Sequence, residues 1–167
     1  MAITSAICNS FKQEILVGTH NFTASSGNSF KIALFTSSAT LSKSTTAYAA
    51  PSDANAKPTS THEVSQKTTD GGATATGYDA GGKALTASAD PVLSTDTACV
   101  KFNDLSWTSA SFTARGCLIY NSTAVTGFTT NRAVCAVNFG ADKTVTSGTF
   151  TVQFPAQTAG SAIVQIA

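Results

Sequence analysis

The sequence SFTARGCLIYN (residues 111–121) is followed by NRAVCAVNFG (131–140) and GTFTVQFP (148–155), and KFNDLSW (101–107) precedes it. These runs are rich in Val, Ile, Phe, Thr and Tyr, and clusters of Asn, Gly, Asp and Ser separate them. Short β-favouring runs with turn residues between them are typical of antiparallel strands joined by turns. The stretch from residue 100 to residue 154 therefore predicts the core of an all-β fold.

Apolar and polar side chains alternate in GTFTVQFP, where Phe150, Val152 and Phe154 share one side of the predicted strand. This alternation predicts a strand with one face in water. The two preceding runs are apolar on both faces, which favours strands buried between two layers. We therefore predict an antiparallel β-sandwich, either jelly-roll-like or immunoglobulin-like, with one short N-terminal α-helix and a long loop insertion.

The length and charge of the chain limit its class. At 167 residues, a single domain over residues 1–167 is expected. Charged residues make up 11% of the chain and the net charge is +1, so the basic footprint of a nucleic-acid-binding protein is missing. No run has the length of a membrane span or the pattern of an export signal. We expect neither nucleic acid nor a membrane as a partner.

Apolar residues recur every four positions near the N-terminus, at Ile3, Ile7, Phe11 and Ile15. This spacing predicts an amphipathic helix over residues 3–17. The helix could pack on the chain's own sandwich, or it could be an arm whose Ile3, Ile7 and Phe11 form an interface with another subunit. We favour the first interpretation, because an amphipathic stripe usually faces its own core.

The run FKIALFTSS predicts a strand over residues 30–38, after which the pattern weakens. Between residues 44 and 97, large apolar side chains are few, and Pro and Gly interrupt any period. We predict a long loop-rich insertion there, with short edge strands near residues 63–68 and 83–87.

Two tyrosines of this insertion, Tyr48 and Tyr78, have two interpretations. They are either local anchors of the loop, which we favour, or exposed aromatic residues at an interface that contacts sugars. The strand-rich core follows over residues 98–167, with Trp107 expected to be buried. SAIVQIA closes the chain as a predicted last strand.

Catalytic, cofactor and metal sites are not expected. His20 and His62 both lie in turn-rich sequence and are interpreted as solvated loop residues. No G-x-S-x-G motif supplies a nucleophile, and His62–Glu63 lacks the second histidine of a zinc-protease helix. The carboxylates do not form a calcium-loop pattern. We therefore expect a protein that is not an enzyme.

The cysteines lack the spacing of a zinc site. Cys117 and Cys135 would lie roughly opposite each other if their runs form a hairpin that turns near Gly127. A disulfide between them is therefore possible. The favoured interpretation is a pair of small buried thiols.

Several stretches in this order resemble a family of small virion proteins of tailed bacteriophages. The matching stretches are AICNSFKQEIL, FKIALFTSSATL with TTAY, GYDAGGKAL, SFTARGCLIYN, and NRAVCAVNFGADKTVTSGTFTVQFP with the apolar tail that follows. They cover about two-thirds of the chain. The chain departs from the family in a longer segment over residues 49–76 and in its cysteines at 99, 117 and 135.

The resemblance implies a structural role in the virion, which is assembled in the host cytoplasm, and supplies no catalytic residues. We expect a capsid decoration (cement) protein that bridges major capsid subunits. The expected partners are the major capsid protein or other virion proteins, together with copies of the chain in a homo-oligomer. The alternatives are a tail tube or neck and tail-completion component, and a host glycan- or receptor-binding module.

Overall fold

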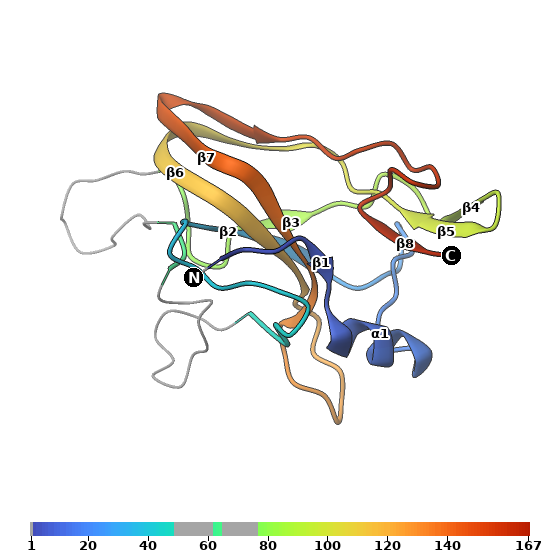
Figure 1. The fold of residues 1–167 in the computed structure, drawn as a ribbon. Coiled ribbons are helices and arrows are strands. Elements are labelled where there is room, and N and C mark those ends of the chain that lie inside the picture. Colours follow the sequence, from blue (N-terminus) through green and yellow to red (C-terminus); the bar gives the residue numbers. More distant parts are fainter. Residues whose placement is uncertain (1, 49–61, 65–76) are drawn as a thin grey trace.

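The computed structural model describes residues 2–48, 62–64 and 77–167, and these form mostly antiparallel β-sheet with one short helix (Figure 1). The elements in chain order are β1 (Ala6–Ile7), α1 (Asn9–Leu16), β2 (Phe30–Phe35), β3 (Lys83–Leu85), β4 (Val92–Ser94), β5 (Thr97–Val100), β6 (Leu105–Asn121), β7 (Arg132–Val152) and β8 (Val164–Ile166). The predicted all-β class is confirmed.

The two longest strands, β6 and β7, form an antiparallel hairpin that runs through the whole molecule (Figure 1). Pairing extends from Asn121 opposite Arg132 to Leu105 opposite Val152. The turn contains Gly127, whose φ of 84° suits glycine, so the predicted hairpin is confirmed. Several register shifts interrupt the pairing, and such bulges bend and twist a strand.

The large sheet has the strand order β1-β7-β6-β2-β3. Its central strand β6 pairs with β7 on one side and with β2 on the other, which places residues 116–121 in the core. Leu118 and Ile119 point to opposite faces and both are fully buried. The prediction of strands that are apolar on both faces is confirmed here.

A small sheet of three strands, in the order β4-β5-β8, lies at one end of the molecule (Figure 1). The last strand, β8, pairs with β5, as expected for the C-terminal apolar run. The small sheet is anchored by Val100 and Val164, which are paired and buried. Phe102 and Phe154 continue this core, with ring centroids 5.7 Å apart.

The helix predicted over residues 3–17 is too long at its start. Ile3 makes a parallel bridge to Leu41, Ala6–Ile7 form β1 on the edge of β7, and the helix begins at Asn9. The reason is that a spacing of four residues puts side chains on one face of a strand as well as of a helix. The free edge of β7 supplies backbone partners, so the first half of the stripe becomes extended.

The loop insertion predicted over residues 44–97 contains more strand than expected. β3 and β4 lie in it and β5 begins at Thr97. The edge strand expected near residues 83–87 is confirmed as β3. Of the edge strand expected near residues 63–68, Glu63 forms a bridge to Phe35, and residues 65–68 lie outside the described residues. β3, β4 and β5 are only three or four residues long, and a run of this length leaves little periodicity to detect. The strand expected over residues 30–38 ends at Phe35.

Candidate functional site

The residues predicted as a possible interface lie inside the chain's own core. Ile3, Phe11, Tyr48 and Tyr78 are all buried and Ile7 is half-buried. The N-terminal stripe therefore packs on the chain's own sheet, as the favoured interpretation predicts. The alternative of an arm that docks on another subunit is wrong, because these side chains are already covered. The tyrosines are buried anchors and not exposed aromatic residues.

These tyrosines surround Glu63, a buried carboxylate that sequence reasoning did not single out. Tyr48 donates a hydrogen bond to its Oε2 at 2.9 Å, Tyr78 donates to Oε1 at 2.7 Å, and the Gly81 N–H donates to Oε1 at 2.8 Å. The Tyr78 hydroxyl oxygen also accepts the Leu34 N–H of β2 at 2.8 Å. Three separate segments are thereby joined to the large sheet through one side chain.

Burial raises the pKa of Glu63, while hydrogen bonds from Tyr78, Gly81 and Tyr48 act in the opposite direction. Burial, with the Glu63 carboxylate nearby, also raises the pKa of Tyr78 well above its ordinary value. Both oxygens of the carboxylate are occupied by donors from the chain itself. This arrangement is suited to holding segments together and offers no free group for proton transfer to a substrate.

The prediction of a solvated His20 is wrong, because the side chain is buried beneath α1 and the hairpin. The Asn121 amide donates to His20 Nδ1 at 3.1 Å, so the ring proton sits on Nε2, which donates to Glu14 at 2.6 Å. Asn121 is fixed in this orientation because it also donates to Asn28 and accepts the Thr123 N–H. Burial lowers the pKa of His20.

The guanidinium of Arg132 completes this cluster. Its side chain is fully buried, with Nε 3.7 Å from Glu14 Oε2 and Nη1 donating to the Thr129 carbonyl at 2.9 Å. Both ring nitrogens of His20 are engaged, so the cluster stabilises the turn end of the hairpin and is not arranged as a general base with a nucleophile.

The possible disulfide between Cys117 and Cys135 does not form, and both are buried free thiols. Cys117 pairs with Val137, while Cys135 pairs with Ile119, so the two cysteines are diagonal neighbours in the sheet. Diagonal neighbours in a sheet are about 7–8 Å apart, beyond the separation that a disulfide bridges. Burial raises the pKa of Cys117 to about 12, which keeps the thiol protonated and unreactive. Within the described ranges, no group of three or more His, Cys, Asp or Glu residues could hold a metal ion.

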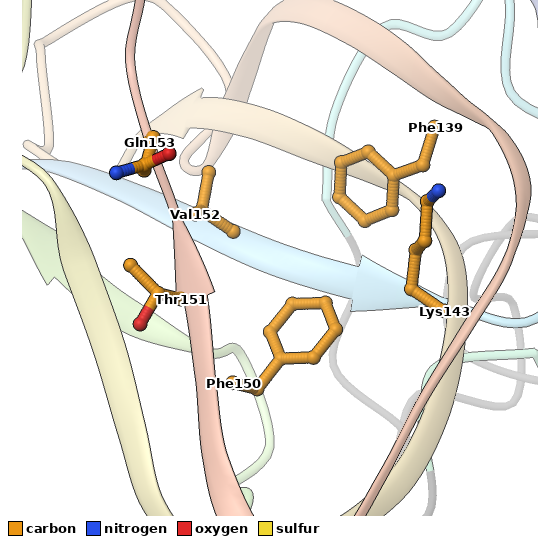
Figure 2. A pocket seen from close by; sticks show the side chains of 6 residues that line it. All are labelled: Phe139, Lys143, Phe150, Thr151, Val152 and Gln153. Atoms are coloured by element: carbon orange, nitrogen blue, oxygen red, sulfur yellow. The ribbon is translucent and has the colours of Figure 1, made fainter.

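The surface of β7 carries an open groove of about 400 Å³, lined by three apolar residues, Phe139, Phe150 and Val152, and by Lys143, Thr151 and Gln153 (Figure 2). It exists because β7 bends: residues 139–142 stand opposite the single Arg115 of β6, and Gly140 has a φ of 79°. The bend brings the rings of Phe139 and Phe150 to 6.4 Å from each other. A bulge of this size leaves no clear sequence signal, so the groove was not predicted.

The outer edge of β7 is covered for only part of its length. Ala47 bridges to Arg132, β1 pairs with residues 135–136, and the Ser5 hydroxyl accepts the Asn138 N–H. Beyond Asn138, no strand of the described part of the chain pairs with this edge. An unpaired strand edge is a template for a strand from another chain.

The small sheet also presents apolar side chains to solvent. Leu93 is 74% exposed and Ile166 is 48% exposed. The register aligns Leu93 with Ala98, and Ala98 with Ile166, so the three form one row across the sheet. Apolar side chains gathered on one face are typical of interaction surfaces.

Comparison with known proteins found no matching family model, no matching curated protein and no matching solved structure. A search of the described residues for a helix long and apolar enough to cross a membrane also found none.

Proposed function

We propose that the chain is a structural protein of a tailed-bacteriophage virion, and that it is a capsid decoration (cement) protein bridging neighbouring major capsid subunits. The observation that carries this proposal is the outer edge of β7, which has no strand partner beyond Asn138 within the described residues. The resemblance of several stretches to small virion proteins adds to it.

A free strand edge suits a protein that works by attachment. A segment of a capsid subunit would add to the edge through backbone hydrogen bonds, as in other cases of strand addition. The exposed face of β7 is rich in threonine and carries few charges, so little charge is desolvated when it is covered. A modest contact of this kind is multiplied by the many equivalent sites of a symmetric shell.

The proposed fold within the all-β class is a β-sandwich, either jelly-roll-like or immunoglobulin-like. Support comes from the aromatic residues between the two sheets. Phe30 of the large sheet lies 5.7 Å from Phe102, and Phe102 lies 5.7 Å from Phe154, as ring centroids. Val100 and Val164 bury one end of the small sheet against this layer.

The proposal also assigns the chain no enzymatic reaction. The buried carboxylate Glu63 and the ring of His20 are each saturated by hydrogen bonds from the chain itself. Their hydrogen bonds join segments of the chain, so we assign both side chains a role in stability and not in catalysis. The glycan-binding alternative loses its aromatic basis, because Tyr48 and Tyr78 are buried.

The test is rebinding of the purified chain to expanded capsids that lack it, with occupancy measured by cryo-electron microscopy. Wild type should occupy regular sites and raise the resistance of the particles to osmotic shock. Thr149→Lys places a charge on the exposed face of β7 and should lower occupancy about tenfold. Thr126→Lys makes the same change at an exposed turn position and should not. Absence of any binding by wild type would contradict the proposal.

A tail tube or neck and tail-completion component is the second candidate, because the same free edge of β7 would serve a ring in which each copy accepts a strand from the next. Mass spectrometry of separated heads and tails distinguishes the two. The chain should appear in the head fraction if it is a decoration protein and in the tail fraction if it is a tail component.

A further inference from the structure

The groove on β7 combines apolar walls with one cation. Phe139, Phe150 and Val152 are half-buried and face the groove, and Lys143 lies beside Phe139 at its rim (Figure 2). The neighbouring Asp142 pairs with Arg115 at 3.1 Å, so it does not neutralise Lys143. Among the described residues, Lys143 has no anionic partner. The groove is therefore suited to an apolar side chain with a carboxylate close to it.

The turn between β4 and β5 carries this combination. Leu93 is the most exposed strand residue among the large hydrophobics at 74%, and Asp96 is exposed on the turn that follows. The pair Ser94 and Thr97 closes the turn, so only Ser94 and Thr95 separate Leu93 from Asp96 along the chain. No ion pair of the described residues involves Asp96.

We propose that the β4–β5 turn of one copy docks into the β7 groove of a second copy, with Leu93 packed against the exposed sides of the two phenylalanine rings and Asp96 beside Lys143. The complementarity is both apolar and electrostatic, and each charge lacks a partner of its own within the described residues. The turn lies at the far end of the small sheet, well away from the groove, so the two surfaces meet between copies and not within one (Figure 1).

Such a contact is heterologous, because the two copies use different surfaces. Repetition of a heterologous contact produces a closed ring or an open row of subunits. One turn in one groove buries less than the roughly 800 Å² per partner of a stable complex. The contact is therefore weak between free copies and is reinforced when many copies are held side by side. This gives a specific form to the homo-oligomer expected from the sequence and does not depend on the virion assignment.

Charge exchange tests the contact with the full chain. Sedimentation velocity at low ionic strength, up to millimolar concentration, should show reversible association of wild type. Asp96→Lys and Lys143→Asp should each weaken association about tenfold, because each replaces an attraction by a repulsion. The double variant carries both reversals and should restore association. Lys12→Asp, at an exposed position on α1, is the charge control and should leave association unchanged.

The apolar half of the contact has its own pair of variants. Leu93→Ser should weaken association about tenfold, as expected for an anchor residue in a pocket. Leu16→Ser changes the 85% exposed end of α1 and should have no effect. A mixture of Asp96→Cys and Lys143→Cys chains should form a cross-linked dimer under oxidation that neither variant forms alone.

A chain that stays monomeric at millimolar concentration, or a double charge variant no better than the single ones, would overturn the contact. Neither result would bear on capsid binding, which is measured separately on particles. Conversely, loss of capsid binding with charge-dependent association intact would remove the virion proposal and leave this contact standing.

Discussion

Glu63 shows how a single buried side chain can organise a part of the chain with few apolar anchors. A carboxylate removed from water is tolerated only when its oxygens are hydrogen-bonded. Here Tyr48, Tyr78 and the Gly81 N–H supply three donors at 2.7–2.9 Å. The tyrosine rings bury apolar surface while their hydroxyls satisfy the charge, so packing and polar satisfaction reinforce each other.

Glu63→Ala should destabilise the protein by about 3 kcal/mol, because it removes the acceptor of the buried hydrogen bonds from Tyr48, Tyr78 and Gly81. Glu63→Gln is the matched control: its carbonyl oxygen keeps the Tyr78 and Gly81 bonds, so the loss should be smaller. Urea unfolding followed by circular dichroism measures both. Equal losses for the two variants would show that the charge, and not the number of donors, matters here.

His20 should make stability sensitive to acid. Its ordinary pKa is 6.5 and burial lowers the pKa in the folded protein, so the unfolded chain binds the proton more tightly. This contribution to stability is complete above pH 6.5 and is lost as the pH falls from 6.5 through the folded pKa. Protonation of His20 would also place an N–H on Nδ1 facing the N–H of the Asn121 amide, which now donates to Nδ1, so two donors would face each other.

His20→Gln removes this titration. The difference in unfolding free energy between wild type and His20→Gln should therefore shrink between about pH 8 and about pH 5. Taking this difference cancels the effect of Glu63, whose raised pKa makes stability fall as the pH rises from 4.5 through its folded pKa. A difference that stays constant with pH would contradict the assignment of a neutral buried His20.

At the scale of elements, the pairing of β2 with β3 depends on a close backbone approach at Gly82. A Cβ at this position would stand 1.8 Å from the Ile32 carbonyl oxygen, and φ is 69°. Both features require glycine. β3 is only three residues long, so its place at the sheet edge depends on this approach.

Gly82→Ala should destabilise the protein by about 3 kcal/mol or more, since the strain of a positive φ is added to a backbone clash. Gly127→Ala is the matched control: φ is 84° there, but nothing lies within 4 Å of the added Cβ. Its loss should be about 1 kcal/mol. Thermal unfolding of the two variants measures the difference in stability. Similar losses of stability would mean that β3 shifts enough to accommodate the added Cβ at position 82.

Elements that bury two faces or alternate cleanly could be predicted from the sequence. Leu118 and Ile119 predicted a strand buried on both faces, and Phe150 and Val152 predicted a strand with one face in water. The latter run was expected as a separate strand, whereas it continues β7, which extends without interruption over Arg132–Val152. The helix was predicted to begin too early, at Ile3, because the spacing of Ile3 and Ile7 fits both a helix and a strand. Glu63 and the β7 groove could not be predicted, because contacts between distant segments and a bulge create them.

At the scale of the molecule, aromatic side chains form a continuous set of ring contacts in the core shared by the two sheets. Phe22 and Phe30 stack with centroids 4.3 Å apart, and Phe102 lies 5.7 Å from Phe30 and 5.7 Å from Phe154. Phe102 is fully buried and its backbone bridges to Ala87. The small sheet buries Val100 and Val164 in the same core cluster as these aromatic residues, so it should unfold together with the large sheet.

Phe102→Ala should lower the unfolding free energy by about 4 kcal/mol while the transition stays cooperative. Phe128→Ala, at a 43% exposed position in the hairpin turn, is the control and should lower it by less than about 1 kcal/mol. Trp107 is the only tryptophan and lies in β6, so its fluorescence reports the large sheet, whereas far-ultraviolet circular dichroism reports both sheets. Coincident urea transitions by the two probes are expected for wild type and for both variants. Two separated transitions in circular dichroism, with fluorescence following only one, would show that the small sheet is an independent unit and that the chain is not a single domain.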